Sequence, residues 1–150
     1  MKTKHYRAAG GVVLDPRGKV LLIERDVSRN GATIHEIRLP KGHIDAGETD
    51  QQAAMRETCE ESGYCALEVI ADLGECRTEY DHNAKHYVRD EHYFLMRLVS
   101  PEWQAPDVDP ESEEALFSVK WARDLDEAES LLTYASEKDF AARARKIAQQ

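Results

Sequence analysis

Hydrophobic residues fall along the chain in short groups whose spacing predicts several β-strands. Residues 8–14 and 19–24 are largely apolar, and Asp15-Pro16-Arg17-Gly18 between them places Pro and Gly where a hairpin turn needs them. Asn30-Gly31 marks a second loop, and Pro40 ends the strand predicted before it. The remaining segments are predicted strands at 35–39, 66–73, 92–99 and 119–122 and a proline-containing loop at 101–110.

The clearest helical signal covers residues 49–62. Thr49 followed by Gln52 forms a capping box, and Gly63 lies where a left-handed residue ends a helix. Because strands and helices do not alternate regularly, the pattern predicts a mixed sheet with helices packed on its faces. The later predicted helices are 125–132 and a C-terminal segment that opens with Ser136 as a cap and carries Phe140, Ala144, Ile147 and Ala148 at helical spacing.

Length and composition suit one domain over residues 1–150. The chain is 41% hydrophobic, enough for a core, and has no repeat or long linker that would divide it. Its longest aliphatic run, residues 20–23, is far shorter than the ~20 residues of a membrane helix. No apolar segment follows the basic N-terminus, so no secretory signal is expected. We therefore expect a cytoplasmic protein without membrane association.

The charge and the cysteines narrow the expected partners and compartment. The net charge of −9 disfavours nonspecific binding to nucleic acid, whereas a small phosphorylated substrate is compatible if cations offset the repulsion. Cys59, Cys65 and Cys76 form no CxxC pair. We expect three reduced thiols in a reducing cytoplasm.

Three carboxylates share one face of the predicted helix at 49–62. With about 100° per residue, Glu60 lies about 60° to one side of Glu57 and Glu61 about 40° to the other. Such crowding destabilises a helix, and no basic residue stands between them in the sequence. Oxygen-only, highly charged sites suit Mg²⁺ or Mn²⁺. The alternative is a solvated acidic face.

The residues before the helix favour the metal-site interpretation. Gly42 and Gly47 allow the backbone of the preceding loop to approach a ligand, and Lys41 adds a cation for phosphate. Glu48 and Arg56 flank the opening turns and are placed to pair, which would hold the loop against the helix.

The spacing over residues 42–64 resembles the Nudix box, and every fixed polar position is filled. Thr58 departs from the pattern, since the family usually carries an aliphatic residue there; we expect this to affect packing more than chemistry. The matching pattern is Gly42, five residues, Glu48, seven residues, Arg56-Glu57, two residues, Glu60-Glu61, one residue, Gly63 and the apolar Tyr64.

The resemblance implies an α/β fold, the Nudix-type α/β/α sandwich with a mixed, curved β-sheet. It implies hydrolysis of a phosphoanhydride bond with Mg²⁺, for which Mn²⁺ can substitute. The residues that it implies are Glu57, Glu60, Glu61 and Gly42 at the metal, and Glu48 and Arg56 as structural partners.

A general base is also required for this chemistry. Glu57 is one candidate. In Nudix relatives that cleave diadenosine polyphosphates, a loop glutamate precedes a Trp-containing strand, and Glu113 or Glu114 stands similarly before Trp121. We favour Glu114, which makes Glu57, Glu61 and Glu114 the expected catalytic residues; the alternative is that Glu114 belongs to a merely charged loop.

Outside the box, residues 9–13, 39–43 and 93–96 resemble the diadenosine polyphosphate hydrolase branch. His43 is typical of that branch and of inositol pyrophosphate phosphatases. Ile37 stands where relatives often carry Trp, so adenine stacking is not expected there. Cations and tyrosines of 77–92 could bind polyphosphate and stack on a base, or could simply form a solvated hairpin. The expected substrate-binding residues are Lys41, His43, Arg77, Tyr80, Lys85, Tyr87 and Arg89.

The leading hypothesis is hydrolysis of dinucleoside polyphosphates. Alternatives are nucleoside triphosphates, nucleoside-diphosphate sugars, inositol pyrophosphates and RNA 5′ ends, the last disfavoured by the acidic charge. A different class is a non-catalytic Nudix-like module that senses a nucleotide. The partner expected is a small nucleotide-type molecule, and the oligomeric state is left open between a monomer and a homodimer.

Overall fold

A seven-stranded sheet organises the molecule, and the computed structural model describes residues 1–149. Its main strand order is β3-β2-β1-β6-β5, with β4 paired to β1 and β7 paired to β2. Strands β1 and β6 run parallel, and the other pairs are antiparallel. The strands are β1 Lys2–Leu14, β2 Val20–Arg29, β3 Ala32–Arg38, β4 Lys41–His43, β5 Leu67–His82, β6 Lys85–Leu98 and β7 Ser118–Ala122. The helices are α1 Asp50–Ser62, the 3₁₀ helix η1 Glu113–Leu116, α2 Leu125–Leu131 and α3 Ala135–Ala148.

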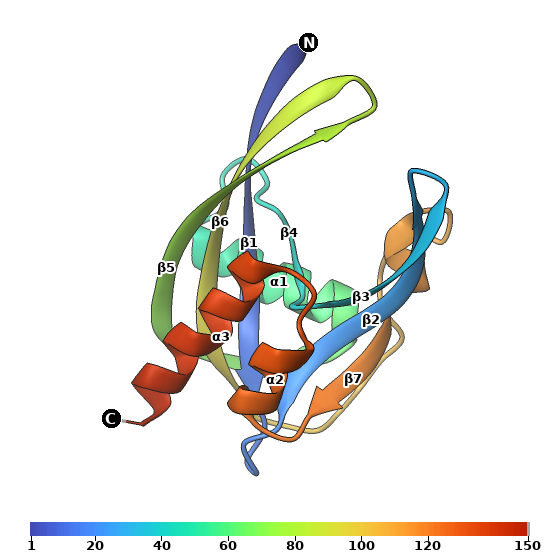
Figure 1. Cartoon of the computed structure of the whole chain (residues 1–150). Coiled ribbons are helices and arrows are strands. Elements are labelled where there is room, and N and C mark those ends of the chain that lie inside the picture. The colour runs from blue at the N-terminus through green and yellow to red at the C-terminus, as the bar shows by residue number, and fades with distance from the viewer. Residues whose placement is uncertain (150) are drawn as a thin grey trace.

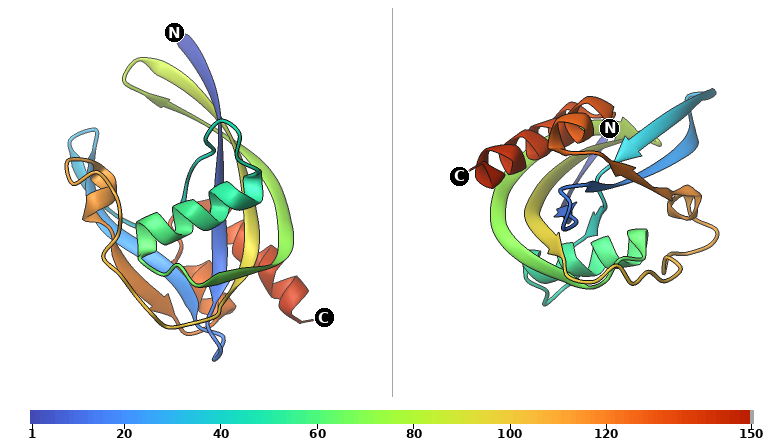
Figure 2. Two further views of the ribbon diagram at one scale, coloured as in Figure 1. Left: turned by 180° about the vertical axis from the view of Figure 1, so that it is seen from behind. Right: turned by 90° about the horizontal axis from the view of Figure 1, so that it is seen from below.

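Helices cover both faces of this sheet (Figure 1). Helix α1 lies on one face and α2 and α3 lie on the other, with the curved sheet between them (Figure 2). The expected α/β/α sandwich with a mixed, curved sheet is confirmed. None of the helices within residues 1–149 has the length and apolar character needed to cross a bilayer.

Each face of the sheet has its own apolar core. On one face, Ala54 of α1 packs in a cluster with Phe94 of β6. On the other, Tyr93 of β6 meets Phe140 of α3, with ring centroids 4.3 Å apart. Successive residues of a strand point to opposite faces, so β6 serves both cores with neighbouring side chains.

Helix α1 begins and ends where the sequence predicts. The Thr49 side chain accepts a hydrogen bond from the Gln52 N–H at 3.1 Å, and the Gln52 side chain accepts one from the Thr49 N–H at 2.9 Å. Gly63 has φ of 87° and donates its N–H to the carbonyl of Cys59. The capping box and the glycine stop therefore fix the helix that carries the three glutamates.

The hairpin of β5 and β6 is longer than predicted. The predicted strands stop at 73 and resume at 92, with a solvated hairpin as one interpretation of 77–92; this segment pairs through Arg77↔Asp90 and Tyr80↔Tyr87 up to a turn at Asn83. Polar residues on both faces conceal the apolar alternation that signals a strand. The tip of the hairpin projects from the body beside the N-terminal part of β1 (Figure 1).

Two local predictions need correction. The turn at 15–18 forms, but β1 and β2 pair there only at Leu14↔Val20, while β1 pairs over its whole length with β6. Ser136 does not cap the last helix: α3 begins at Ala135 after Tyr134, which makes no side-chain capping bond. The charged segment before β7 forms the short helix η1.

The expectation of three reduced thiols is wrong. Cys59 and Cys65 form a disulfide, and Cys76 of β5 is free. The turn at Gly63 folds the chain back after α1 and brings the two cysteines together, their Cα atoms 4.4 Å apart. The sequence alone does not reveal this disulfide, because Cys59 and Cys65 come together only through the turn at Gly63.

Candidate active site

The glycine loop and α1 meet at two buried carboxylates. Gly42 of β4 lies so close to the Glu57 carboxylate that a Cβ at this position would overlap it and displace the carboxylate. Glu61, one turn later on α1, accepts a hydrogen bond from the backbone N–H of Lys41 at 2.7 Å. The pairing of β4 with β1 thus holds the loop directly over Glu57 and Glu61.

Arg56 joins the loop to the helix. Its guanidinium donates to both carboxylate oxygens of Glu48, at 2.7 and 2.9 Å, and to the carbonyl of His43. It also donates to Glu57 at 2.7 Å and to Glu60 at 3.1 Å. The positive charge of Arg56 therefore partly screens these glutamates. The sequence pattern did not predict this screening, because Arg56 precedes the glutamates and does not stand between them.

Burial makes the negative charge of Glu57 and Glu61 unfavourable. It raises the pKa of Glu57, an effect that the hydrogen bond from Arg56 opposes. Burial also raises the pKa of Glu61, and the nearby Glu114 and Glu57 add to the rise while Lys41 opposes it. The negative charge of Glu114, from η1, thus adds to the rise in pKa at both of these glutamates of α1.

The chemistry of this donor set suits a divalent cation, although the ligand atoms of Glu57, Glu60 and Glu61 do not all lie within 4.8 Å of one another. Mg²⁺ and Mn²⁺ prefer carboxylate oxygens, and a bound cation would relieve the repulsion that raises the pKa of Glu61. Glu57 and Glu61 are buried and Glu60 is half-buried, so a cation there would be held at the edge of the protein with room for water and substrate. Glu57, Glu60 and Glu61 are the residues that would hold it.

A pocket of about 120 Å³ opens beside these carboxylates. It brings Lys41 and His43 of the loop together with Glu61 of α1 and Glu114 of η1. Burial lowers the pKa of Lys41, and the positive charges of Arg38 and Arg89 lower it further. Negative and positive groups therefore stand next to each other in the pocket wall. The lining residues are Tyr6, Ala8, Ile23, Arg25, Arg38, Leu39, Lys41, Gly42, His43, Glu61, Glu114 and Phe117.

Two arginines of this pocket were missed by the sequence analysis. Arg25 stacks on Phe117 with its guanidinium carbon 4.1 Å from the ring centroid, and it donates to Glu36 at 2.9 Å. Arg38 donates to Glu137 at 2.8 Å. The signal that could have found them is a cation directly after an apolar strand and another directly before the Leu-Pro of the glycine loop.

The hairpin residues proposed for substrate binding divide into two groups. Tyr80 and Tyr87 stack at 5.0 Å, and the Tyr80 hydroxyl lies 2.8 Å from that of Tyr6, which lines the pocket. Arg77 is not brought there, because it lies on the opposite face of β5 from Tyr80 and pairs with Asp90. Of the remaining hairpin residues, Arg89 donates to Thr78 and Lys85 lies at the start of β6. His43, which belongs to β4 and not to the hairpin, stacks on Tyr6.

Ile37 takes no part in the pocket. Its side chain packs against the core under α3, and its N–H donates to the Thr133 hydroxyl at 2.8 Å.

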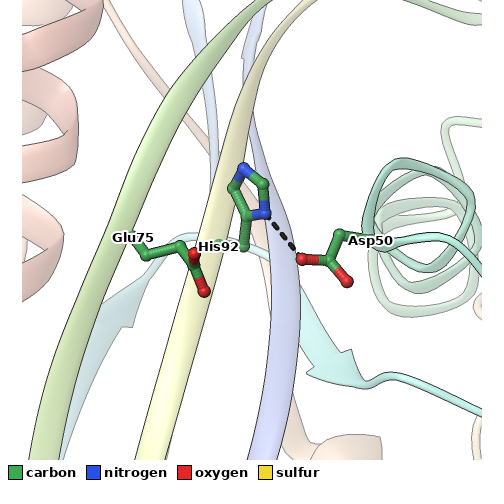
Figure 3. A group of neighbouring side chains, drawn as sticks. All are labelled: Asp50, Glu75 and His92. Carbon is green, nitrogen blue, oxygen red and sulfur yellow. Dashed lines mark hydrogen bonds and ion pairs between the residues drawn. The ribbon is translucent and has the colours of Figure 1, made fainter.

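A second acidic cluster lies at the N-terminal end of α1, where Asp50, Glu75 and His92 place ligand-type atoms within 4.8 Å of one another (Figure 3). Arg7 already occupies this place, because its guanidinium donates to both oxygens of Asp50 and to Glu75 at 2.7–2.8 Å. His92 lies between Asp50, at 2.7 Å, and Asp72, at 2.6 Å. We therefore interpret this cluster as an ion-pair network that anchors α1.

Comparison with known proteins agrees with this geometry. MutT4 of Mycobacterium tuberculosis is 34% identical over 146 residues, which cover 94% of this chain and 55% of that protein. The RNA pyrophosphohydrolase of Erythrobacter litoralis is 36% identical over 104 residues, 62% of each chain, so this chain spans little more than half the length of these two relatives. The crystal structure of a C. elegans Ap4A hydrolase binary complex shares the fold, with a TM-score of 0.66 at 24% identity over 96% of this chain and 98% of that one. A family model described as NUDIX domain matches residues 4–144, and the chain therefore belongs to the NUDIX family.

Proposed function

We propose that this protein is a Mg²⁺-dependent pyrophosphohydrolase that cleaves a phosphoanhydride bond in nucleoside-diphosphate-linked substrates, with dinucleoside polyphosphates as the leading class. The observation that carries the proposal is the pocket in which Glu61 and Glu114 stand beside Lys41, with Arg25 and Arg38 in the same wall. A metal–polyphosphate complex has the matching charges, since its cation needs carboxylates and its phosphates need basic groups.

Each residue has a distinct task in this proposal. Glu57, Glu60 and Glu61 hold Mg²⁺, which when bound supplies charge neutralisation at the phosphate oxygens and a more acidic water. Lys41 and the arginines orient the polyphosphate chain for in-line attack. Glu114 accepts the proton of the attacking water, with Glu57 as the alternative base.

The substrate class rests on the sequence of the glycine loop and on the relatives. The Leu39–His43 segment resembles dinucleoside polyphosphate hydrolases, and a bis(5′-nucleosyl)-tetraphosphatase of Rattus norvegicus is 38% identical over 65 residues. RNA 5′ ends are the second candidate, since the Erythrobacter litoralis relative is named for that substrate. The net charge of −9 disfavours a polyanion. The remaining candidate substrates are nucleoside triphosphates, nucleoside-diphosphate sugars and inositol pyrophosphates.

A substrate panel tests the proposal. The purified chain is incubated with Mg²⁺ and diadenosine tetraphosphate, nucleoside triphosphates, a nucleoside-diphosphate sugar, an inositol pyrophosphate or 5′-triphosphate RNA, and the products are identified by mass. We expect turnover of diadenosine tetraphosphate that excess chelator abolishes.

Two variants sharpen this experiment. Removing a general base should lower kcat by about 10²–10⁴-fold, so Glu114→Gln should be impaired to that extent. The control Glu111→Gln changes an exposed glutamate of the same acidic segment and should remain active. Nucleotide binding without turnover of any substrate would instead support the non-catalytic module.

A further inference from the structure

The disulfide lies within the segment that carries the proposed metal ligands. Cys59 is in the last turn of α1, and Cys65 follows the turn at Gly63. The ring that the disulfide closes contains Glu60 and Glu61, two of the three carboxylates proposed to hold Mg²⁺.

This end of α1 needs support from outside the helix. Carboxylates near a helix C-terminus oppose the helix dipole, and the last turn of α1 contains no basic residue. Gly63 caps the helix, and the disulfide covalently restrains the same turn. Opening the disulfide removes the covalent one of these two restraints.

The same ring is the docking point for the segment that leads to Glu114. The Asp107 N–H donates to the carbonyl of Glu60 at 2.9 Å, and the Gln104 N–H donates to that of Gly63 at 3.0 Å. The Trp103 indole N–H donates to the carbonyl of Ser62 at 2.8 Å. Movement of the ring would therefore disturb both sides of the pocket, Glu61 directly and η1 through residues 103–107.

The disulfide is also accessible to a reductant. Cys65 is exposed and Cys59 is half-buried. Cys76 lies apart in β5, where burial raises the pKa of its thiol, and a protonated thiol is a poor nucleophile. Exchange chemistry should therefore begin at the sulfur of Cys65 and not involve Cys76.

We propose that the Cys59–Cys65 disulfide is a thiol–disulfide exchange site for dithiol reductants, and that its reduction weakens cation binding by the glutamates of α1. A thiolate of the dithiol attacks the Cys65 sulfur, the Cys59–Cys65 bond breaks, and Cys59 leaves as a thiolate that takes up a proton. The second thiol of the reductant then displaces Cys65, so the dithiol becomes a cyclic disulfide and the protein gains two thiols and two electrons. The consequence for cation binding rests on the proposed function; the exchange itself does not.

The test uses the full chain and separates these two parts. Oxidised protein is compared with protein reduced by dithiothreitol and then freed of it by anaerobic gel filtration. Maleimide labelling and mass measurement should count one thiol, at Cys76, before reduction and three after it. Mn²⁺ affinity is measured by the electron paramagnetic resonance signal of the free ion. Because groups that orient metal ligands are worth about 10–100-fold in affinity, we expect about tenfold weaker Mn²⁺ binding after reduction.

Variants keep the outcome decisive. Cys59→Ser/Cys65→Ser should bind Mn²⁺ like the reduced protein, and the matched control Cys76→Ser should bind like the oxidised protein. Circular dichroism checks that each variant is folded. If the double variant is not folded, the single variant Cys65→Ala is used in its place. Three thiols before reduction, or equal Mn²⁺ affinity in both redox states, would overturn the inference. A redox-dependent Mn²⁺ affinity without turnover of any nucleotide would instead leave it standing and remove the proposed hydrolase activity.

Discussion

At the N-terminal end of α1, Asp50 meets the guanidinium of Arg7 and the ring of His92, whereas at the C-terminal end Glu57 and Glu61 are crowded into a buried position. The hydrogen bond from Arg7 lowers the pKa of Asp50, although its partial burial opposes this, and His92 lowers it further. Burial raises the pKa of Glu61. The pKa is thus lowered for the carboxylate at the N-terminal end of α1 and raised for the one near its C-terminal end.

The difference shows which carboxylates serve folding. An acid in the first turn is favoured by the helix dipole, and Asp50 gains ion pairs as well. Acids in the last turns are disfavoured by the same dipole, and the only cation that contacts Glu57 and Glu60 within residues 1–149 is Arg56. Stability alone does not explain Glu61, and its place beside the pocket is why we propose that it binds a cation.

The largest expected effect comes from Glu61→Gln. Loss of a metal ligand should cost several kcal/mol of transition-state stabilisation, a fall in kcat of about 10²–10⁴-fold. The metal-free protein should nevertheless melt at a slightly higher temperature at pH 8, because a buried charge has been removed while a side-chain oxygen remains for the Lys41 N–H. Kinetics with diadenosine tetraphosphate and calorimetry measure the two effects.

The control for this variant is Glu68→Gln, which breaks an exposed pair with Arg97 on the neighbouring hairpin. It should change neither kcat nor the melting temperature appreciably. A metal-free Glu61→Gln protein that melts several degrees below wild type would mean that Glu61 serves folding after all.

Asp50→Asn should have the opposite effects to Glu61→Gln, lowering stability and leaving activity nearly unchanged. The variant weakens charged hydrogen bonds from Arg7 and His92, so the free energy of unfolding should fall by about 2–3 kcal/mol. The pocket is formed by other residues, so kcat should stay close to that of wild type. Urea unfolding and the hydrolysis assay check both statements. An Asp50→Asn protein of normal stability and low activity would remove the contrast between the two ends.

The covalent restraint at the C-terminal end should have an intermediate effect on stability. A disulfide that closes so short a ring is expected to contribute about 2 kcal/mol, which Cys59→Ser/Cys65→Ser would lose. Cys76→Ser, which removes only a free thiol, is the comparison. Urea unfolding under non-reducing conditions measures both, and equal midpoints for wild type and the double variant would show that Gly63 alone secures the turn.

Local rules in the sequence were enough to predict α1 and its glutamates. Thr49, Gln52 and Gly63 act within one turn of where they stand, and Glu48 and Arg56 meet because Glu48 directly precedes the capping residue and Arg56 lies about two turns along the helix. The mixed sheet also followed from the order of the elements.

What the sequence did not reveal depends on contacts between distant segments. Arg25 and Arg38 enter the pocket because β2 and β3 lie beside the glycine loop, so their places next to an apolar segment and to Leu39-Pro40 gain meaning only once that arrangement is known. The disulfide arises from the direction in which the chain turns after α1. Thr58 departs from the family pattern, and it is buried with a hydroxyl that has no hydrogen-bond partner within residues 1–149; its effect on packing stays a prediction.

The smallest expected effect is the pH dependence of the N-terminal network. Burial lowers the pKa of His92, but the bonds to Asp50 and Asp72 outweigh it and the pKa is raised. A raised pKa in the folded state gives stability that is complete below the unfolded value of about 6.5 and is lost as pH rises through the folded value. The pKa values of Asp50 and Asp72 are lowered, so their contribution appears above about pH 4 and persists at higher pH.

His92→Gln should therefore narrow the difference in unfolding free energy between pH 6 and pH 9 by on the order of 1 kcal/mol. The matched control is His86→Gln, because His86 also lies between two carboxylates, Glu79 and Asp81, but on the projecting hairpin where solvent screens the pairs. Its removal should leave the pH profile unchanged. If the two variants shift the profile equally, the anchoring of α1 does not depend on the charge of His92, and the network at Asp50 acts through Arg7 alone.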